Sequence, residues 1–557
     1  MNVAQRFGIT ETHPKPHSTM VSPETETPQK SQELDREPRQ HSLQPASHSI
    51  NNLPDELLLE IATYLEGDNQ ALGSLTQVSR RFKVIGGELL YRTINLSRSR
   101  EDNTIYLVRT LIEKPDLGSK IRQLAFSTTI YGDNTLLVLN QAMICTNMYT
   151  AMLLQIAQSV NRLDLFGTES PFESKEEFVW RSKLMIGLPN AVAGLLLALC
   201  DNLRMLHVNV YCQENLCVPT SDIYRALYGI EGDKVQHTPG HWSGFSQFRT
   251  IKRLRIFGES MRMLQLPFYS LQVLEIDLWR EYSTTDAAYG EHESFANSVA
   301  QCLLPPYPNI DTLIVRSDWA ELHGETHLYH DEQLPCLFQN LPQSTITHLE
   351  ILFVRSPTAV KRWCGSFEYI ARALSDAENV SLSLEYLKID YEVSNHFDPR
   401  RCFGRCTNVP GLHSFSKLTK MEVLQGVLLY EARNTFNEHH YFNGIIPPPN
   451  LESLTVICPT LAIFEWLDIL VDHKTDAPYL CEIILLCRCG YGIGPKEFEG
   501  DVATRVFEKL KELGVDVSVV EEKVGAFAAQ ARKDGSVWEA DWSEDGWVEG
   551  LFGEEMG

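Results

Sequence analysis

The stretch IKRLRI, at positions 251–256, is followed by LQVLEI at positions 271–276, and the two share one pattern of apolar residues. Each has an apolar first residue, a leucine in fourth place and an apolar sixth residue. Alternation over the last four positions is typical of a β-strand, because successive side chains of a strand point to opposite faces of a sheet. We therefore expect two short strands that turn the same face toward a core.

The same pattern recurs along most of the chain, with starts about 20 to 48 residues apart. The other occurrences begin at Ile121, Val160, Leu203, Ile310, Ile346, Leu384, Leu418, Leu451 and Leu480. Helix-like stretches lie between several of them: NAVAGLLLALC, FANSVAQCLL, WCGSFEYIARAL and LAIFEWLDILV. Strand, crossover helix and strand, repeated in one sense, favour parallel pairing of neighbouring strands.

The segment before these repeats predicts three short helices. In INNLPDELLLEIATYLEGDNQALGSLTQVSRRFKVIGGELLYRTINL, Pro54 suits the first turn of a helix. The first two apolar sets recur at helical spacing, and Gly67 ends the first. The third set contains Gly86 and Gly87, which weaken a helix. A bundle of this size has too little core to be robust alone, so we expect it to dock on another molecule.

This segment resembles an F-box. The resemblance rests on Leu53-Pro54, Leu57-Leu58, Ile61, Leu65, Leu75, Val78-Ser79-Arg80-Arg81 and Phe82, in that order. Three positions depart from the family: Ala62 stands where Phe is common, Ser79 replaces Cys, and Phe82 replaces Trp. The resemblance implies binding to a Skp-family adaptor through Leu53, Pro54, Leu57, Leu58, Ile61, Leu65, Leu75, Val78 and Phe82. The alternative is a generic helical hairpin.

The repeated part resembles an irregular leucine-rich-repeat array, of the kind that follows an F-box in many fungal proteins. The resemblance implies an α/β fold: a short all-helical F-box followed by a right-handed leucine-rich-repeat-like solenoid with a parallel sheet, whose units cover one another's apolar faces. The regular family places Asn or Cys just after each strand. This chain has Thr168, Tyr211, Glu259, Trp279, Asp318 and Glu392 there, so we do not expect uniform curvature. A doubly wound α/β domain is the alternative.

Four segments are expected from composition and pattern: a disordered tail at 1–48, the F-box at 49–95, the solenoid at 96–530, and an acidic, Trp-containing tail or cap at 531–557. The first is poor in aliphatic residues and cannot offset its ordering entropy. The solenoid should end in a helix at 501–514, with Asp501 as N-cap and Gly514 as C-cap, and the strand VDVSVVE. The last segment either caps the array or attracts a basic partner.

Charge and composition exclude several classes of protein. The 49 Lys and Arg against 73 Asp and Glu give a net charge of −24, which argues against nucleic acid as a partner. No apolar run reaches the roughly 18–20 residues that cross a bilayer, and the N-terminus lacks a signal-peptide pattern, so we expect a cytoplasmic or nuclear protein with no membrane partner. The 13 cysteines are scattered, as reduced core thiols would be; a metal site at Cys481, Cys487 and Cys489 is the alternative.

No catalytic motif stands out. The chain has no HExxH, GxSxG or Walker sequence, and GYGIGPK lacks the spacing of a phosphate-binding loop. The pair His439-His440 has no partner cysteine or carboxylate motif. We therefore expect no catalytic residue, metal or cofactor, and no enzyme.

The repeats point instead to a binding surface. Residues between the apolar positions of each strand must face away from the core, on the concave side of a solenoid. Those that we select as candidate substrate-binding residues are Arg162, Phe166, His207, Arg253, Arg255, Phe257, Arg316 and Tyr386. Aromatic residues and arginines are enriched in protein-recognition surfaces. The alternative to substrate binding is that these charges pair with one another within the sheet. If the strands at 251 and 271 are neighbours in register, Arg253 and Arg255 lie beside Val273 and Glu275, and the charges can pair.

These expectations combine into a substrate receptor of a cullin–RING ubiquitin ligase, which binds cullin through the Skp-family adaptor and holds an unknown protein substrate. Such a subunit acts by proximity, since it raises the effective concentration of a substrate lysine near the ubiquitin-loaded enzyme. Two alternatives remain: a non-degradative binding scaffold and an uncharacterised α/β enzyme.

Overall fold

The computed structural model describes residues 50, 53–65, 69–96, 101–130, 152–156, 158–159, 184–185, 188–212, 246–257, 268–277, 310–318, 337–338, 346–354, 374, 378–391, 412–429, 447–488 and 494–522. They fall into two compact units, Met1–Tyr91 and Arg92–Gly557, here termed the helical unit and the sheet unit. The expected tails at 1–48 and 531–557 and the pattern at Val160 lie outside the described residues. So do most of the helix-like stretches FANSVAQCLL and WCGSFEYIARAL.

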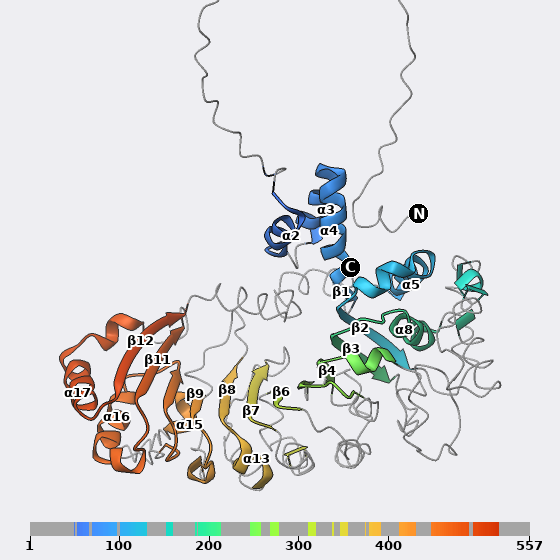
Figure 1. Ribbon diagram of the computed structural model, residues 1–557. Coiled ribbons are helices and arrows are strands. Elements are labelled where there is room, and N and C mark those ends of the chain that lie inside the picture. Colours follow the sequence, from blue (N-terminus) through green and yellow to red (C-terminus); the bar gives the residue numbers. More distant parts are fainter. Residues whose placement is uncertain are drawn as a thin grey trace, which may run out of the picture. The chain divides into compact units, whose positions relative to one another are not determined.

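The helical unit contains the three short helices that its apolar spacing predicts. They are α2 (Asp55–Thr63), α3 (Asn69–Val78) and α4 (Arg80–Arg92) (Figure 1). Their buried core consists of Leu58, Ala62, Leu72, Phe82, Ile85 and Leu89. A core of so few residues is small for an independent fold.

Helix α4 runs unbroken through Gly86 and Gly87. Its first turn is capped by Ser79, whose Oγ accepts a hydrogen bond from the backbone N–H of Phe82 at 3.2 Å. A Cβ on Gly86 would lie 2.9 Å from Cγ2 of Thr76, on α3, whereas one on Gly87 would meet nothing within 4 Å. Gly86 therefore allows α3 and α4 to approach closely, which explains a glycine inside this helix.

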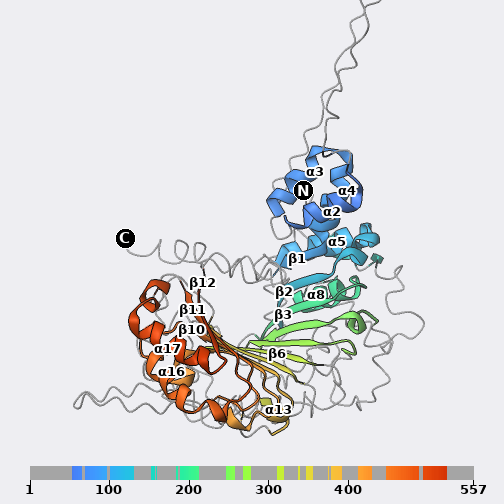
Figure 2. The same ribbon diagram turned by 60° about the vertical axis from the view of Figure 1, so that its left-hand side comes forward.

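The sheet unit is built on an open parallel sheet of 12 strands, and each strand pairs with the next one along the chain (Figures 1 and 2). The strands are β1 (Thr93–Leu96), β2 (Gln123–Ile130), β3 (Met205–Cys212), β4 (Arg253–Phe257), β5 (Val273–Asp277), β6 (Thr312–Asp318), β7 (His348–Val354), β8 (Tyr386–Tyr391), β9 (Lys420–Leu424), β10 (Ser453–Ile457), β11 (Glu482–Arg488) and β12 (Asp516–Glu522). The predicted α/β class and parallel sheet are confirmed. A doubly wound sheet reverses its strand order at a switch point, so that alternative is wrong.

Every repeated pattern that falls on described residues leads into a strand, which begins two residues after the first apolar position. Strand β4, for example, begins at Arg253, two residues after Ile251. The expected final strand is present as β12. Strand β1 was not expected, because TINL follows a helix without the repeated pattern.

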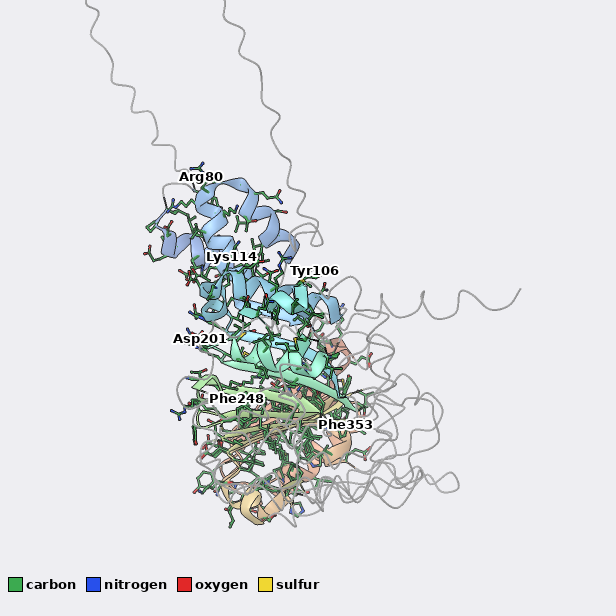
Figure 3. All side chains as sticks on the ribbon, turned by 90° about the vertical axis from the view of Figure 1, so that its right-hand side faces the viewer. Arg80, Tyr106, Lys114, Asp201, Phe248 and Phe353 are labelled. Carbon is green, nitrogen blue, oxygen red and sulfur yellow. The ribbon has the colours of Figure 1, made fainter. Side chains whose placement is uncertain are left out.

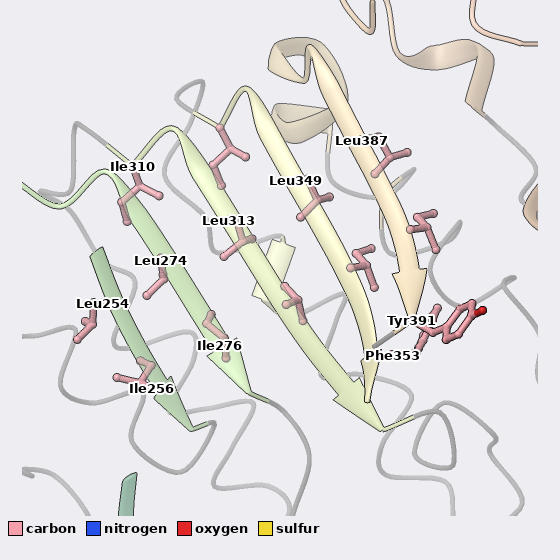
Figure 4. Close-up of a cluster of buried hydrophobic side chains, with 14 of the residues drawn as sticks. Leu254, Ile256, Leu274, Ile276, Ile310, Leu313, Leu349, Phe353, Leu387 and Tyr391 are labelled. Atoms are coloured by element: carbon pink, nitrogen blue, oxygen red, sulfur yellow. The ribbon is translucent and has the colours of Figure 1, made fainter. Parts of the chain in front are cut away.

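The core lies on one face of the sheet, where equivalent leucines of neighbouring strands stand in direct register. Figure 4 shows the row of Leu254, Leu274, Leu313, Leu349 and Leu387. All five side chains are fully buried. Removing each leucine from water stabilises the fold by about 1.5–3 kcal/mol, which makes this row the main support of the sheet.

Helices α8 (Pro189–Ala198), α16 (Ile463–Asp472) and α17 (Asp501–Glu512) cover the same core. All three were expected from the sequence; α5 (Glu101–Glu113) was not. The other elements are η2 (Pro115–Lys120), η4 (Ser246–Thr250), α13 (Glu378–Ser383), η7 (Leu412–Ser414), α15 (Gln425–Leu428), η8 (Lys474–Asp476) and η9 (Pro495–Phe498).

The ends of α17 agree only in part with the sequence. Asp501 is the first helical residue, and Gly500 holds the N-cap position that we assigned to Asp501. At the other end Gly514 has a φ of 80° and begins the exit, as predicted. The N–H of Val515 donates to the carbonyl oxygen of Leu510 at 2.9 Å, which completes a Schellman motif.

Short polar side chains tie four of the described strands' repeats to the strand before them. Thr250 Oγ1 donates to the carbonyl of Leu203 at 2.7 Å. Ser383 Oγ donates to the carbonyl of Ile346 at 2.8 Å. Further donors of this kind are Asn202, to Ser119, and Asn450, to Ser416. Each donor directly precedes the first apolar position of a repeat, so this ladder lies before the strands rather than after them, where regular leucine-rich repeats have their Asn or Cys.

Candidate functional site

An apolar stripe on α2 is exposed within the helical unit. Leu57, Ile61 and Tyr64 follow one another at helical spacing, and their side chains are 45%, 46% and 84% exposed. The adjacent face of the same helix carries Leu58 and Ala62, which are buried in the core. One helix therefore presents two apolar stripes, of which only one is covered by its own unit.

The nine predicted adaptor-binding residues separate into two groups. Leu58 and Phe82 lie in the helical core, and Leu53, Leu65 and Leu75 pack against it. Those that are exposed are Pro54, Leu57, Ile61 and Val78. Ala62, which stands where Phe is common in the family, is buried in the core of the unit.

Arg81 holds the start of α2 against α4. Its Nε donates to Oδ1 of Asp55, and its Nη2 donates to the carbonyl oxygen of Leu53. These bonds fix the turn that carries Pro54 and orient the first turn of α2. The sequence indicated only that a basic residue belongs at this position; the residues that it would bond were not foreseen.

The polar face of the sheet lies opposite the leucine row and carries two buried clusters of charges. The first, here the Glu275 cluster, consists of Arg253, Arg255, Glu275, Asp277 and Arg316, on β4, β5 and β6. Arg255 Nε lies 2.8 Å from Oδ2 of Asp277, while Arg253 and Arg316 both bond Glu275. The register places Arg255 directly beside Glu275, as the internal alternative assumed.

The charges of this cluster stabilise one another. Burial raises the pKa of Glu275, but the neighbouring guanidinium groups of Arg316, Arg253 and Arg255 outweigh burial and hold that pKa well below its usual range. Burial lowers the pKa of Arg255 and Arg316 lowers it further, while Asp277 and Glu275 more than compensate and raise it. Glu275 and Arg255 therefore stay ionised although they are buried.

The second group, here the Asp390 cluster, joins β8, β11 and β12. Arg488 bonds both oxygens of Asp390, at 2.7 and 2.8 Å, and its Nε donates to Glu522 at 2.6 Å. Burial raises the pKa of Asp390, but the charge and hydrogen bonds of Arg488 lower it overall. Lys388 adds a charge 3.6 Å from Asp390.

An aromatic residue and a thiol pack against this cluster. The guanidinium carbon of Arg488 lies 5.2 Å from the ring centroid of Tyr391, and the hydroxyl of Tyr391 contacts Sγ of Cys458 at 3.1 Å. Burial raises the pKa of Tyr391 and of Cys458, so both remain protonated at neutral pH. A thiol that is buried and protonated is a poor nucleophile.

Between the two clusters, part of the polar face is accessible. His348 stacks on Tyr386 with ring centroids 4.1 Å apart, and Lys420 Nζ lies 5.3 Å from the same ring. The side chains of His348 and Lys420 are 33% and 49% exposed. Burial and the adjacent carboxylates, chiefly Glu422, raise the pKa of Tyr386. The three neighbouring strands thus offer an aromatic and cationic surface.

Those predicted substrate-binding residues whose side chains the structure describes are not gathered into one accessible site. His207, Arg255 and Arg316 are buried, Arg253 is mostly buried, and Tyr386 is half-buried. Arg162, Phe166 and the side chain of Phe257 lie outside the described residues. Internal pairing accounts for Arg253, Arg255 and Arg316, and binding of a substrate by these residues stays a prediction.

Membrane-spanning helices and metal-binding clusters can be considered only for the part of the chain that the structure describes. Within it, no helix combines the length and apolarity needed to cross a membrane, and no three or more His, Cys, Asp or Glu side chains converge on a metal position. Cys487 is buried in β11, and Cys481 is exposed. Cys489, His439, His440 and residues 490–493 of the sequence GYGIGPK lie outside the described residues.

Comparison with known proteins bears on the helical unit. The family model described as F-box-like matches residues 50–97. No curated protein and no solved structure matches the chain. F-box domains generally bind Skp-family adaptors and serve ubiquitin ligases as adaptors for substrate recognition. The match covers α2, α3, α4 and β1, and thus identifies residues 50–97 as an F-box-like domain.

Proposed function

We propose that the chain is the substrate-recognition subunit of a Skp–cullin–F-box ubiquitin ligase. The observation that carries this proposal is the F-box-like match on a unit that leaves an apolar stripe of its first helix uncovered. Leu57, Ile61 and Val78 would contact the adaptor, while Leu58 and Phe82 hold the domain together. Apolar side chains that are exposed on neighbouring turns are typical of a protein–protein interface.

The sheet unit would then hold a protein substrate. We propose that it is a right-handed leucine-rich-repeat-like solenoid, of the type seen after an F-box in fungal proteins. Strictly sequential parallel strands, one repeated apolar pattern and the polar side chains that bond the preceding repeat before β3, β4, β8 and β10 support this architecture. Solenoids offer long continuous surfaces for partners. The chain would form no bond itself and would act by proximity.

The direct test is capture of a Skp-family adaptor by the full chain. We expect Leu57→Asp combined with Ile61→Asp to abolish capture, because two carboxylates would be buried at an apolar interface. Val502→Asp, on α17, is the matched control: Val502 is 51% exposed in the sheet unit, and its substitution should leave capture unchanged.

Folding must be separated from binding in this test. Leu57 and Ile61 are exposed, so hydrogen exchange of α3 and α4 should be the same in the double variant and the wild type. Equal capture by the two proteins, with exchange unchanged, would refute adaptor binding by this stripe.

A second candidate function is a binding scaffold that does not lead to degradation. It is favoured by the burial of charged residues on the polar face, where they serve the fold rather than a substrate. Cullin in the adaptor complex, and a bound protein whose ubiquitylation requires the full chain, support the ligase. An adaptor complex without cullin supports the scaffold.

A further inference from the structure

A row of cations lies along the margin of the sheet where the strands begin. Arg122, Arg204 and Lys252 each immediately precede a strand, β2, β3 and β4 respectively. Backbone hydrogen bonds join these residues in series, and we call each such position a rung. The N–H of Arg204 donates to the carbonyl of Arg122, and that of Lys252 to the carbonyl of Arg204, both at 2.8 Å. Neighbouring rungs are about 4.8 Å apart, so three positive charges stand side by side. We term these residues the cation row.

The cation row is accessible. Arg204 and Lys252 are exposed, and Arg122 is half-buried. Asp201 and Phe248, which precede β3 and β4, lie at this margin in Figure 3, opposite Phe353 near the end of β7. The row is therefore separate from the Glu275 and Asp390 clusters, which lie on the polar face of the strands.

Among the residues that the structure describes, none of the three side chains of the cation row forms an ion pair or a hydrogen bond. The arginines of the polar face behave differently, since Arg255, Arg316 and Arg488 all pair with carboxylates. Like charges directly opposite one another destabilise a sheet. An anionic partner would remove that repulsion, whereas the fold by itself does not.

The same rungs carry the opposite charge further along the sheet. The equivalent residues before β6, β8 and β10 are Asp311, Glu385 and Glu452, all exposed. Backbone bonds join them to their neighbours in the same way, for example from the N–H of Asp311 to the carbonyl of Gln272 at 3.0 Å. The residues directly before the strands are thus basic at β2–β4 and acidic at β6, β8 and β10, which would give a bound chain a direction.

Next to the row stands an aromatic contact. The guanidinium carbon of Arg249, on η4, lies 5.8 Å from the ring centroid of Tyr269, and Tyr269 is 49% exposed. Both residues come shortly before a strand, so they stand at the same margin as Lys252. An exposed ring at the margin that carries the cation row suits a polypeptide with an apolar side chain among its carboxylates.

We propose that Arg122, Arg204 and Lys252 bind a short acidic segment of a partner protein. The three residues span two spacings between neighbouring strands, about 10 Å in all, which matches a few residues of an extended chain. A nucleic acid is less suited, because phosphate-backbone binders generally use more contacts and a basic surface, whereas this chain carries a net charge of −24. The proposal does not depend on adaptor binding by the helical unit.

The test measures binding of a fluorescein-labelled peptide of alternating Glu and Gly to the full chain, by anisotropy. The test variant carries Arg122→Gln, Arg204→Gln and Lys252→Gln. The control carries Lys417→Gln, Arg505→Gln and Lys511→Gln, three exposed residues whose loss changes the net charge equally. We expect the dissociation constant to rise about tenfold in the test variant, as three surface ion pairs of about 0.5 kcal/mol each would give, and to stay within about twofold in the control.

Four outcomes would overturn the proposal. The first is equal weakening in the two variants, and the second is equal affinity of the wild type for an alternating Lys and Gly peptide. The third is tighter binding of single-stranded RNA that the test variant loses, which would assign the row to nucleic acid. The fourth concerns the chain's own acidic residues 534–557: if the peptide binds only after their removal and they compete with it, they are the occupant. If the thermal unfolding midpoints of both variants equal that of the wild type, a folding defect is excluded.

Discussion

Arg488, on β11, forms a two-pronged ion pair with Asp390, on β8, although β9 and β10 lie between them in the sheet. Those two strands end at Leu424 and Ile457, which the register places level with Leu486. Arg488 lies two residues further along β11, so its side chain passes beyond their ends. The pair joins positions 98 residues apart and links β8 directly to β11, which is not its neighbour in the sheet.

Breaking this pair should be costly because both partners are buried. We expect Arg488→Met to lower the free energy of unfolding by about 3–5 kcal/mol, since it leaves the Asp390 carboxylate buried without its counter-charge. Lys509→Met is the control: Lys509 pairs with Asp468 at 2.7 Å, but the two side chains are 45% and 55% exposed, so the loss should stay below about 1 kcal/mol. Urea unfolding followed by tryptophan fluorescence measures both, and similar losses would show that the Asp390 cluster contributes no more than a surface pair.

The buried carboxylates should make the sheet unit sensitive to acid. In the folded state the pKa values of Asp390, Glu275 and Glu350 are lowered: burial raises each, and the adjacent cations, with a hydrogen bond from His348 for Glu350, outweigh it. A lowered pKa stabilises the fold above the unfolded value of about 4 and loses that contribution as the pH falls through the folded value. We expect the unfolding midpoint to fall steeply below about pH 4. Asp390→Asn should flatten this fall, and an unchanged slope would contradict the assignment.

The strands and their parallel order could be predicted because one apolar pattern repeats. In IKRLRI and LQVLEI the alternation fixes which side chains are buried, and one register then carries Leu254 beside Leu274. The short TINL of β1 lacks that pattern and was missed. Its place in the sheet is decided by pairing with β2, which is a property of the fold and not of the four residues.

The exposed stripe and the charged clusters were harder to predict. Leu57 and Leu58 are adjacent apolar residues of one predicted helix. Only the packing of the helix shows that Leu57 is exposed and Leu58 is buried. Pairing of the arginines of β4 with carboxylates of β5, such as that of Arg255 with Asp277, could be predicted once the register of the two strands was assumed. The bond from Arg488 to Asp390 was not, because it spans 98 positions and depends on where two intervening strands end.

Two adjacent glycines of α4 should respond in opposite ways to alanine. At Gly87 a Cβ meets nothing within 4 Å, so Gly87→Ala should stabilise the helical unit by up to about 1 kcal/mol through helix propensity. At Gly86 the new methyl would lie 2.9 Å from Cγ2 of Thr76 and 3.4 Å from the carbonyl oxygen of Leu72, so Gly86→Ala should destabilise the unit by about 1–3 kcal/mol. Hydrogen exchange of α3 amides reports on both variants. Equal protection in the two would show that α3 and α4 do not depend on this close approach.

Gly118, in η2, marks the closest approach of backbone in the sheet unit among the described glycines. A Cβ at this position would lie 2.1 Å from the carbonyl oxygen of Leu199, at the end of α8, and a backbone oxygen cannot move aside as a side chain does. Gly118→Ala should therefore push η2 away from α8 and lower the free energy of unfolding by about 3 kcal/mol or more, at the upper end of overpacking effects. Gly494→Ala, at a site where a Cβ meets nothing within 4 Å, is the control and should change stability little. The cation row gives this variant a second readout, because Arg122 lies two residues after the end of η2: displacement of the segment should also weaken binding of the acidic peptide. A Gly118→Ala protein with wild-type stability would show that η2 and α8 are not in contact in solution.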